Sequence, residues 1–316
     1  PYAQYYKEHY KAGACGRTNL FKIFVERGML LLKTKGTFTY IMPNSYLADN
    51  SILLRDFLLE RMLLEIIEYT EKDKVFENVA QAVTTIVVKN EKPATNHRCH
   101  IVTAKQGDAT VLQSDFFANE GHSFISVSPL ISKMRKQEHS LEEWFDIFQG
   151  EINLTTKAKY FGRDERLGSL LMWRGDNVGR YTSTYAPTEF CEKEATQRDH
   201  WQHERIVMKQ VTNQQSAFRT SAFITPKNYF CGNSTNYLLP KNRSIPLKAF
   251  LGLLNSNAFN YLFSYFSFTN HITTAELIGV KVPDIGDLVD TGIIIVVDEI
   301  LAAKKVDPSA DTSALE

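Results

Sequence analysis

Helix and strand patterns alternate over residues 1–91, and this alternation limits the possible folds more than any other feature of the chain. Apolar residues recur at helical spacing over residues 18–36, where Thr18 or Asn19 can cap a helix and Gly36 ends it. The following patterns predict a strand in TFTYIMP (37–43), a helix in SILLRDFLLERM (51–62), and strands in LLEIIEYT (63–70) and AVTTIVVKN (82–90). Residues 1–92 are therefore predicted to form an α/β sheet with helices on its faces.

The rest of the chain is predicted to divide into three parts, which are a connector at 93–140, an α+β domain at 141–285, and a C-terminal helix with a polar tail at 286–316. The connector holds a predicted strand at 99–104 and a basic helix at 131–139. Residues 251–266 form an apolar run that predicts a helix within the core of the α+β domain. A final amphipathic helix is expected from Asp287 to Lys305.

Charge and cysteine content exclude several classes of protein. The formal net charge is zero, so a site for nucleic acid has to arise from a local cluster of basic residues. The four cysteines have no Cys-x-x-Cys spacing, which predicts neither a disulfide framework nor a zinc site and fits a reducing cytoplasm. The apolar run at 293–303 is too short and too acidic to span a bilayer.

One long stretch carries no acidic residue. Between Arg205 and Ala275 the sequence has no Asp or Glu, whereas basic residues and many Asn, Gln, Ser and Thr recur. The basic residues are Arg205, Lys209, Arg219, Lys227, Lys241, Arg243 and Lys248. Lys and Arg neutralise phosphates, and Asn, Gln and Arg can hydrogen-bond to base edges, so the stretch predicts a nucleic-acid surface. The alternative is a solvated polar surface with β-turns.

Several motifs in residues 1–90 occur in one order. The chain begins Pro1-Tyr2, a helix ends in Phe-x-Glu-Arg-Gly (24–28), a strand runs into Pro-Asn-Ser (43–45), and Val-Phe-Glu (75–77) precedes the last strand. This order resembles the second half of the catalytic domain of Taq-type (gamma-class) adenine-specific DNA methyltransferases and of Type IIG restriction-modification enzymes. The resemblance implies that Pro1 and Tyr2 are the end of an Asn-Pro-Pro-Tyr loop, cut within the active site.

That resemblance implies a site for a flipped adenine. A base taken out of the duplex needs aromatic faces in place of its neighbours. Tyr2 and Phe76 are expected to supply these faces, and a Pro carbonyl is expected to accept a hydrogen bond from the amino group. The alternatives are a disordered terminus for Tyr2 and a core aromatic for Phe76.

The cofactor and nuclease motifs of the family are not expected in this segment. S-adenosylmethionine binding in the full-length parent would use a Gly-rich turn and an acidic residue that lie before the Pro-Pro-Tyr loop. AGACG (12–16) follows no strand and is interpreted as a turn that breaks a helix, so no cofactor-binding residue is assigned. No Glu-x-Lys occurs, so neither a nuclease centre of that kind nor a metal site is predicted.

Five stretches of the later sequence resemble the target recognition domain of the same enzymes. They are LLMWRGDNVGRY (170–181), HERIVMKQVT (203–212), CGNSTNYLLP (231–240) and the segments 247–266 and 276–283. The resemblance implies DNA contacts by Arg174, Lys209, Asn213, Gln214 and Arg219, with Asn233, Ser234 and Thr235 as second choices. The expected partners are double-stranded DNA and the upstream half of the methyltransferase domain. Since the first strands of the sheet would lie upstream, an unpaired edge is expected, which favours self-association or cover by a partner.

Two functions remain open from the sequence. The first is a fragment of a site-specific DNA adenine-N6 methyltransferase, inactive alone, that supplies the pocket for the target base and sequence-specific DNA binding. The second is a DNA-binding specificity module with no catalytic activity of its own. A plain structural α/β protein is a weaker third alternative, and it predicts no salt-sensitive DNA binding.

Overall fold

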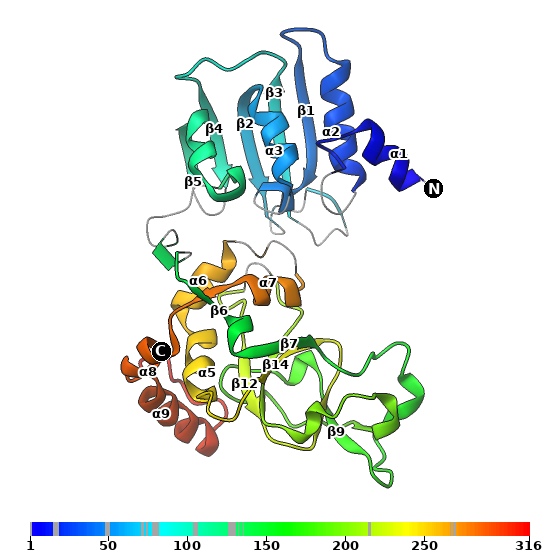
Figure 1. The fold of residues 1–316 in the computed structure, drawn as a ribbon, viewed down its shortest axis with the longest axis vertical. Coiled ribbons are helices and arrows are strands. Elements are labelled where there is room, and N and C mark those ends of the chain that lie inside the picture. The colour runs from blue at the N-terminus through cyan, green and yellow to red at the C-terminus, as the bar shows by residue number, and fades with distance from the viewer. Residues whose placement is uncertain are drawn as a thin grey trace. The chain divides into compact units, whose positions relative to one another are not determined.

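The computed structural model describes residues 2–14, 19–47, 51–70, 73, 75–77, 82–103, 107–125, 131, 133–134, 136–213, 216–265, 267 and 270–316. The chain divides into two compact units, Pro1–Ser128 and Pro129–Glu316. Each unit has its own sheets and helices (Figure 1) and is described by itself.

The first unit is a five-stranded sheet with the strand order β1-β3-β2-β4-β5. Its strands are β1 (Thr37–Pro43), β2 (Met62–Tyr69), β3 (Val83–Lys89), β4 (Arg98–Thr103) and β5 (Gly107–Leu112). Strand β3 is antiparallel to both β1 and β2, β4 is parallel to β2, and β5 is antiparallel to β4. The strands predicted at 37–43, 63–70, 82–90 and 99–104 are confirmed within one or two residues at most ends.

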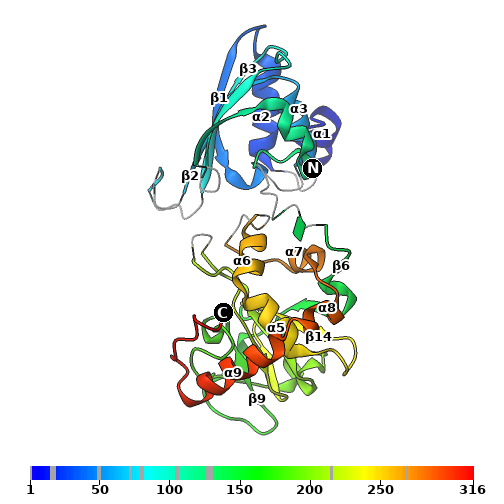
Figure 2. The same ribbon diagram turned by 90° about the vertical axis from the view of Figure 1, so that its left-hand side faces the viewer.

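The helices of this unit cover one face of the sheet (Figure 2). They are α1 (Tyr2–His9), α2 (Leu20–Leu31) and α3 (Ile52–Leu59). The unit also contains the short 3-10 turn η1 (Asn44–Leu47) before α3, and the turns η3 (Gln113–Ala118) and η4 (Glu120–His122) after β5. Asn19 caps α2, because its side chain accepts a hydrogen bond from the backbone N–H of Phe21 at 3.4 Å. The α/β class predicted for residues 1–92 is confirmed, and among the described residues the helices lie on this one face.

The predicted connector at 93–140 differs from the structure. Strands β4 and β5 extend the first sheet, and the boundary between the units falls after Ser128. The sheet has five strands in this chain, and β1 lies at one end of it. The basic helix predicted at 131–139 lies partly outside the described residues, and residues 139–140 form a strand.

The second unit contains two four-stranded sheets and one two-stranded sheet. The first sheet, in the order β12-β11-β14-β7, is formed by β7 (Phe145–Gln149), β11 (Arg205–Lys209), β12 (Ala222–Thr225) and β14 (Thr235–Pro240). The second, in the order β13-β9-β10-β8, is formed by β8 (Phe161–Gly162), β9 (Leu170–Trp173), β10 (Phe190–Cys191) and β13 (Tyr229–Cys231). Strands β6 (His139–Ser140) and β15 (Lys281–Val282) pair separately. Short 3-10 turns lie between these strands, namely η5 (Leu141–Glu143), η6 (Ala158–Tyr160), η7 (Gly175–Asn177), η8 (Lys193–Ala195) and η9 (His200–Gln202).

A hydrophobic core joins the two larger sheets. It combines residues of β9, β11, β12, β13 and β14, namely Trp173, Val207, Phe223, Cys231 and Tyr237, together with Val178. The Trp173 indole donates a hydrogen bond to the Thr225 hydroxyl at 2.6 Å, which satisfies its one polar group inside the core. The sheets therefore hold the loops at their ends in a fixed arrangement.

The C-terminal helices are α5 (Leu247–Asn255), α6 (Asn257–Ser264), α7 (Thr274–Gly279), α8 (Ile285–Asp290) and α9 (Ile293–Val306). The helix predicted at 251–266 is two helices, because Ser256 ends α5 and caps α6 by accepting from the N–H of Phe259 at 3.0 Å. The helix predicted from Asp287 to Lys305 is also two helices. Gly292 separates them with φ of 77°, a left-handed conformation that ends a helix.

Candidate DNA interface

The tight turn of residues 232–235, between β13 and β14, is where loops of the second unit meet, and it is called the hub turn below. The N–H of Asn233 donates to the carbonyl of Ile152 at 2.8 Å, and the N–H of Gln210 donates to the carbonyl of Ser234 at 3.1 Å. The N–H of Gly175 donates to the hydroxyl of Ser234 at 2.9 Å. The hub turn therefore joins the loops that follow β7, β9 and β11.

Glycines make these close contacts possible. A Cβ atom on Gly150 would lie 2.0 Å from the carbonyl oxygen of Gly232, and one on Gly175 would lie 2.7 Å from that of Ser234. Both neighbours are backbone atoms that cannot turn aside as a flexible side chain would. The sequence therefore has to place glycine on both sides of the junction for the loops to approach each other.

Side chains of the hub turn satisfy backbone groups. The amide oxygen of Asn233 accepts from the N–H of Leu154 at 3.1 Å, and the hydroxyl of Thr235, which is fully buried, donates to the carbonyl of Gly232 at 2.8 Å. Together with the Ser234 contact to Gly175, these bonds hold the loops in place. The junction brings together five of the residues expected to contact DNA, namely Arg174, Lys209, Asn233, Ser234 and Thr235.

Arg174 lies where β9 ends and η7 begins. Its Nη2 donates to Oε1 of Glu189 at 3.0 Å, and its Nε lies against Oε2 of the same carboxylate. The guanidinium carbon is 5.4 Å from the centre of the Phe161 ring, within the range of a cation–π contact. A cavity of about 190 Å³ opens beside it, lined by Met172, Arg174, Asp176, Asn177, Tyr185, Thr188 and Glu189.

Lys209 and Asn213 lie along the chain that leaves β11. Lys209 is half-buried at the end of the strand and pairs with Thr235 of β14. Asn213 is exposed and follows a segment that is held by a bridge from Val211 to His271. Gln214 lies outside the described residues.

Arg219 occupies a different place from the one expected of a DNA contact. Its side chain is 3% exposed, and its guanidinium donates to the Thr212 hydroxyl at 3.1 Å and to the Ser267 hydroxyl at 3.0 Å. These bonds tie the loop before β12 to the chain after α6. Burial therefore argues against a direct contact between Arg219 and DNA.

In the folded protein, carboxylates from other segments neutralise part of the positive charge of the acid-free stretch. Arg205 is fully buried and forms an ion pair with Glu151 at 2.7 Å, and Lys248 contacts Asp298 of α9. Although burial opposes its charge, the pKa of Arg205 is raised above its usual range by the neighbouring Cys231 thiol and Glu151 carboxylate. The carboxylates that neutralise these basic residues come from other segments, so the interpretation of the whole stretch as a basic surface was wrong for Arg205 and Lys248.

The motifs of the first unit shape its sheet. Gly28 lets α2 approach β1, because a Cβ there would lie 2.3 Å from the Phe38 ring. The Asn44 amide, in the Pro-Asn-Ser motif, is buried and donates to the Glu68 carboxylate at 2.9 Å, which joins the ends of β1 and β2.

Two of the expected residues of the base site, Tyr2 and Phe76, reach solvent. Tyr2 is 73% exposed as the first residue of α1, so it lies in a helix where a loop was expected. Phe76 is 46% exposed, which excludes the alternative of a core aromatic. Pro1 lies outside the described residues.

The described part of the chain has neither a cluster of metal ligands nor a membrane-spanning helix. It contains no group of three or more His, Cys, Asp or Glu side chains that could hold a metal ion. None of its helices is both long and apolar enough to cross a membrane.

A segment of each unit matches a family of restriction-modification proteins. Residues 2–76 match the model of the Eco57I restriction-modification methylase, and residues 170–285 match the model of the TaqI-like C-terminal specificity domain. The chain thus joins part of a restriction-modification methylase to a TaqI-like specificity domain, as the sequence motifs predicted. No curated protein matches the chain.

Solved structures support this fold. The Type IIL restriction-modification enzyme MmeI, solved with DNA, is 11% identical with a TM-score of 0.57, and the alignment covers 93% of this chain and 45% of MmeI. DrdV, also solved as a DNA complex, is 8% identical with a TM-score of 0.52, and the alignment covers 95% of this chain and 41% of DrdV. The chain thus spans less than half the length of either structure.

Glu189 and Phe161, which surround Arg174, could not be identified from the sequence. They are 15 and 13 residues away from Arg174 along the chain, and no motif connects the three. The signal that the sequence did contain was Gly150 with Gly175 and Gly232, since glycines at three loop starts indicate close backbone contacts.

Proposed function

We propose that this chain is the part of a site-specific DNA adenine-N6 methyltransferase that holds the target base and reads the surrounding sequence. The observation that carries the proposal is the junction at the hub turn, where residues expected to contact DNA converge within the matched specificity domain. DNA is the partner named for MmeI and DrdV, which share the fold. The role in a restriction-modification system follows from both family models.

Lys209, Asn213, Gln214 and Arg174 are the proposed DNA contacts. Lys209 would neutralise a phosphate, since its ammonium carries charge without a fixed direction. Asn213 and Gln214 carry amides that can pair with adenine edges. Asn233, Ser234 and Thr235 would act by holding the loops in position, because their side chains already bond to backbone groups.

Pro1, Tyr2 and Phe76 would flank the flipped adenine. Two exposed aromatic rings can replace the stacking that the base loses, which is worth roughly 1–3 kcal/mol per base. The Pro1 carbonyl would accept from the amino group of the base. Replacement of Phe76 by Ala in the full-length parent should lower methylation of a duplex more than that of a mismatched target, since a mismatched base costs less to flip.

The parent enzyme would take its methyl group from S-adenosylmethionine, as a methylase of this family implies. The Gly-rich segment near Gly13 does not fit the cofactor. The N–H of Gly13 donates to the Glu26 carboxylate at 2.6 Å, and a Cβ there would lie 2.7 Å from the Lys22 carbonyl oxygen. This backbone is therefore used for packing against α2.

Calorimetry separates a complete cofactor site from a partial one. This chain alone should give no saturable heat with S-adenosylmethionine, whereas a micromolar affinity would contradict the assignment of the cofactor site to an upstream half. That upstream half is the partner proposed for the edge strand β1. Light scattering should show self-association of the isolated chain, and a monomer at all concentrations would argue against an exposed edge.

The second candidate is a specificity module without catalysis. It is favoured by the observation that the matched specificity domain has its own sheets and core. DNA binding tests both candidates, because affinity should fall steeply as salt rises if phosphates are contacted. Absence of salt-dependent binding to duplex DNA would contradict both of them.

A further inference from the structure

The two contacts of Arg174 to Glu189 use one side of the guanidinium. An arginine has five N–H donors in a rigid plane. Nε and Nη2 face the Glu189 carboxylate, and Nε is buried. Within the described part of the chain, Nη1 makes no further hydrogen bond, so the end of the fork formed by Nη1 and the second N–H of Nη2 remains available.

Three contacts fix where this fork points. The carboxylate holds one side, the Phe161 ring lies 5.4 Å from the guanidinium carbon, and the backbone N–H of Arg174 donates to the Asn177 amide oxygen at 2.8 Å. The side chain retains 38% of its exposure and borders the cavity beside η7. An arginine fixed in this way loses little conformational entropy when it binds a ligand.

The ion pair also indicates the kind of ligand. Phosphate contacts depend on net positive charge, and Glu189 neutralises Arg174. The directions of the N–H donors are unaffected by this neutralisation. A guanine edge presents O6 and N7, the acceptor pair that an arginine fork matches.

We propose that Arg174 reads one guanine in the major groove through its Nη1 and Nη2 donors, and that Glu189 is a positioning residue that holds it. This inference rests on the proposed DNA-binding function and names one base pair of the recognition sequence. Glu189 acts through Arg174 and makes no contact with the base.

The test begins with selection from randomised duplexes by the whole 316-residue chain. The selected motif should contain a guanine whose replacement by adenine weakens wild-type binding by about 5- to 150-fold. In Arg174→Ala, the ratio of the affinities for the guanine and adenine duplexes should fall to about 1 at that position alone. The corresponding ratios at the other positions of the motif should remain as in the wild type. Glu189→Gln should lower the ratio at the same position, because it keeps one hydrogen bond and loses the charge.

A neighbouring pair provides the control. Arg166 contacts Glu192 through Nη1, so the end of its fork is occupied, and the two glutamates directly precede and follow β10. Arg166→Ala should leave every position of the motif unchanged. The melting temperature of each variant shows whether the domain remains folded.

Each outcome is decisive. If Arg174→Ala weakens binding equally for all sequences, the residue contacts a phosphate and the inference is overturned. An unchanged motif in Arg174→Ala overturns it as well. If the wild-type chain selects no motif, the proposed function fails, and this result is distinct from a motif that does not depend on Arg174.

Discussion

At the scale of single residues, the close backbone contacts at the hub turn leave little room for a larger side chain. Gly150→Ala would place a Cβ 2.0 Å from the Gly232 carbonyl oxygen, so the loops would have to move apart. We expect a loss of about 3 kcal/mol in the free energy of unfolding, measured by urea denaturation. Gly162→Ala is the matched control, because its Cβ would meet no atom within 4 Å. Equal stability of the two variants would contradict the close packing of this junction.

Lys209 and Arg219 should respond differently to substitution although both lie in the acid-free stretch. Lys209→Ala should weaken DNA binding similarly for all sequences and lower the slope of log affinity against log salt by about 1, with stability unchanged. Arg219→Ala should lower the free energy of unfolding by roughly 2 kcal/mol, because it leaves buried hydroxyls of Thr212 and Ser267 without their partner. Its folded form should bind DNA as the wild type does. If Arg219→Ala weakened DNA binding and Lys209→Ala lowered stability instead, the assignment of Lys209 as a DNA contact and of Arg219 as a structural residue would be contradicted.

At the scale of elements, the sequence predicted β1, β2, β3, α2 and α3 because each is short, periodic and bounded by a capping or breaking residue, whereas α1 was not predicted. TFTYIMP and α2 with its Asn19 cap are examples. The interruptions at Ser256 and Gly292 were not predicted, since the apolar pattern continues across both. The roles of Arg205 and Arg219 could not be predicted either, because Glu151 and Ser267 come to them only through tertiary packing.

The break between α8 and α9 gives a prediction at this scale. Gly292 has φ of 77°, where an L side chain is strained. Gly292→Ala should cost about 1 kcal/mol of stability, observed as a lower urea midpoint. Gly279→Ala, which has an ordinary φ and an open site, serves as the control. A more stable Gly292→Ala protein would indicate one continuous helix, as the apolar pattern predicted.

His100 connects three strands of the first sheet. Its ring nitrogens lie 3.0 Å from the Glu65 carboxylate of β2 and 2.9 Å from the Asp108 carboxylate of β5. Hydrogen bonds to Glu65 and then to Asp108 raise the pKa of His100 above its usual value. Because the folded pKa is the higher one, this stabilisation is complete below about pH 6.5 and is lost as pH rises through the folded pKa.

Replacement of His100 by Gln should therefore lower the melting temperature at about pH 6 and have a smaller effect at about pH 8.5. NMR titration of the wild type should give a pKa above that of a free histidine, and Asp108→Asn should reduce it. A pKa for His100 below the free value would show that the two carboxylates do not control the ring.

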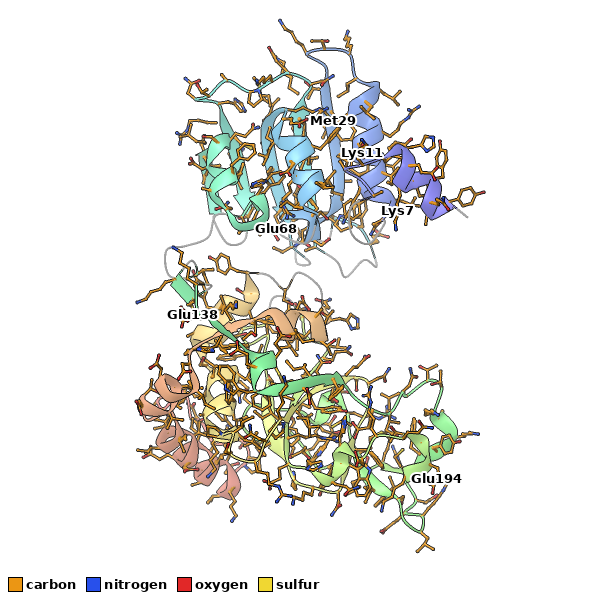
Figure 3. The ribbon with its side chains drawn as sticks, in the orientation of Figure 1. Lys7, Lys11, Met29, Glu68, Glu138 and Glu194 are labelled. Carbon is orange, nitrogen blue, oxygen red and sulfur yellow. The ribbon has the colours of Figure 1, made fainter. Side chains whose placement is uncertain are left out.

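At the scale of the whole molecule, the chain combines one sheet, covered by helices on one face, with a separate domain that has its own cores. Figure 3 shows side chains filling the interior of each unit. This division agrees with the two family matches, because residues 2–76 lie before Ser128 and residues 170–285 lie after it. In the proposed function, the second unit reads the DNA sequence and the first unit holds the target base.

The most direct measurement is the selection of duplexes from a random library by the intact chain, followed by affinities at several salt concentrations. We predict one short enriched motif and an affinity for it that exceeds that for unrelated DNA by at least about 10³-fold. An unenriched library, or a chain that binds all duplexes equally, would contradict the claim that this protein reads DNA sequence.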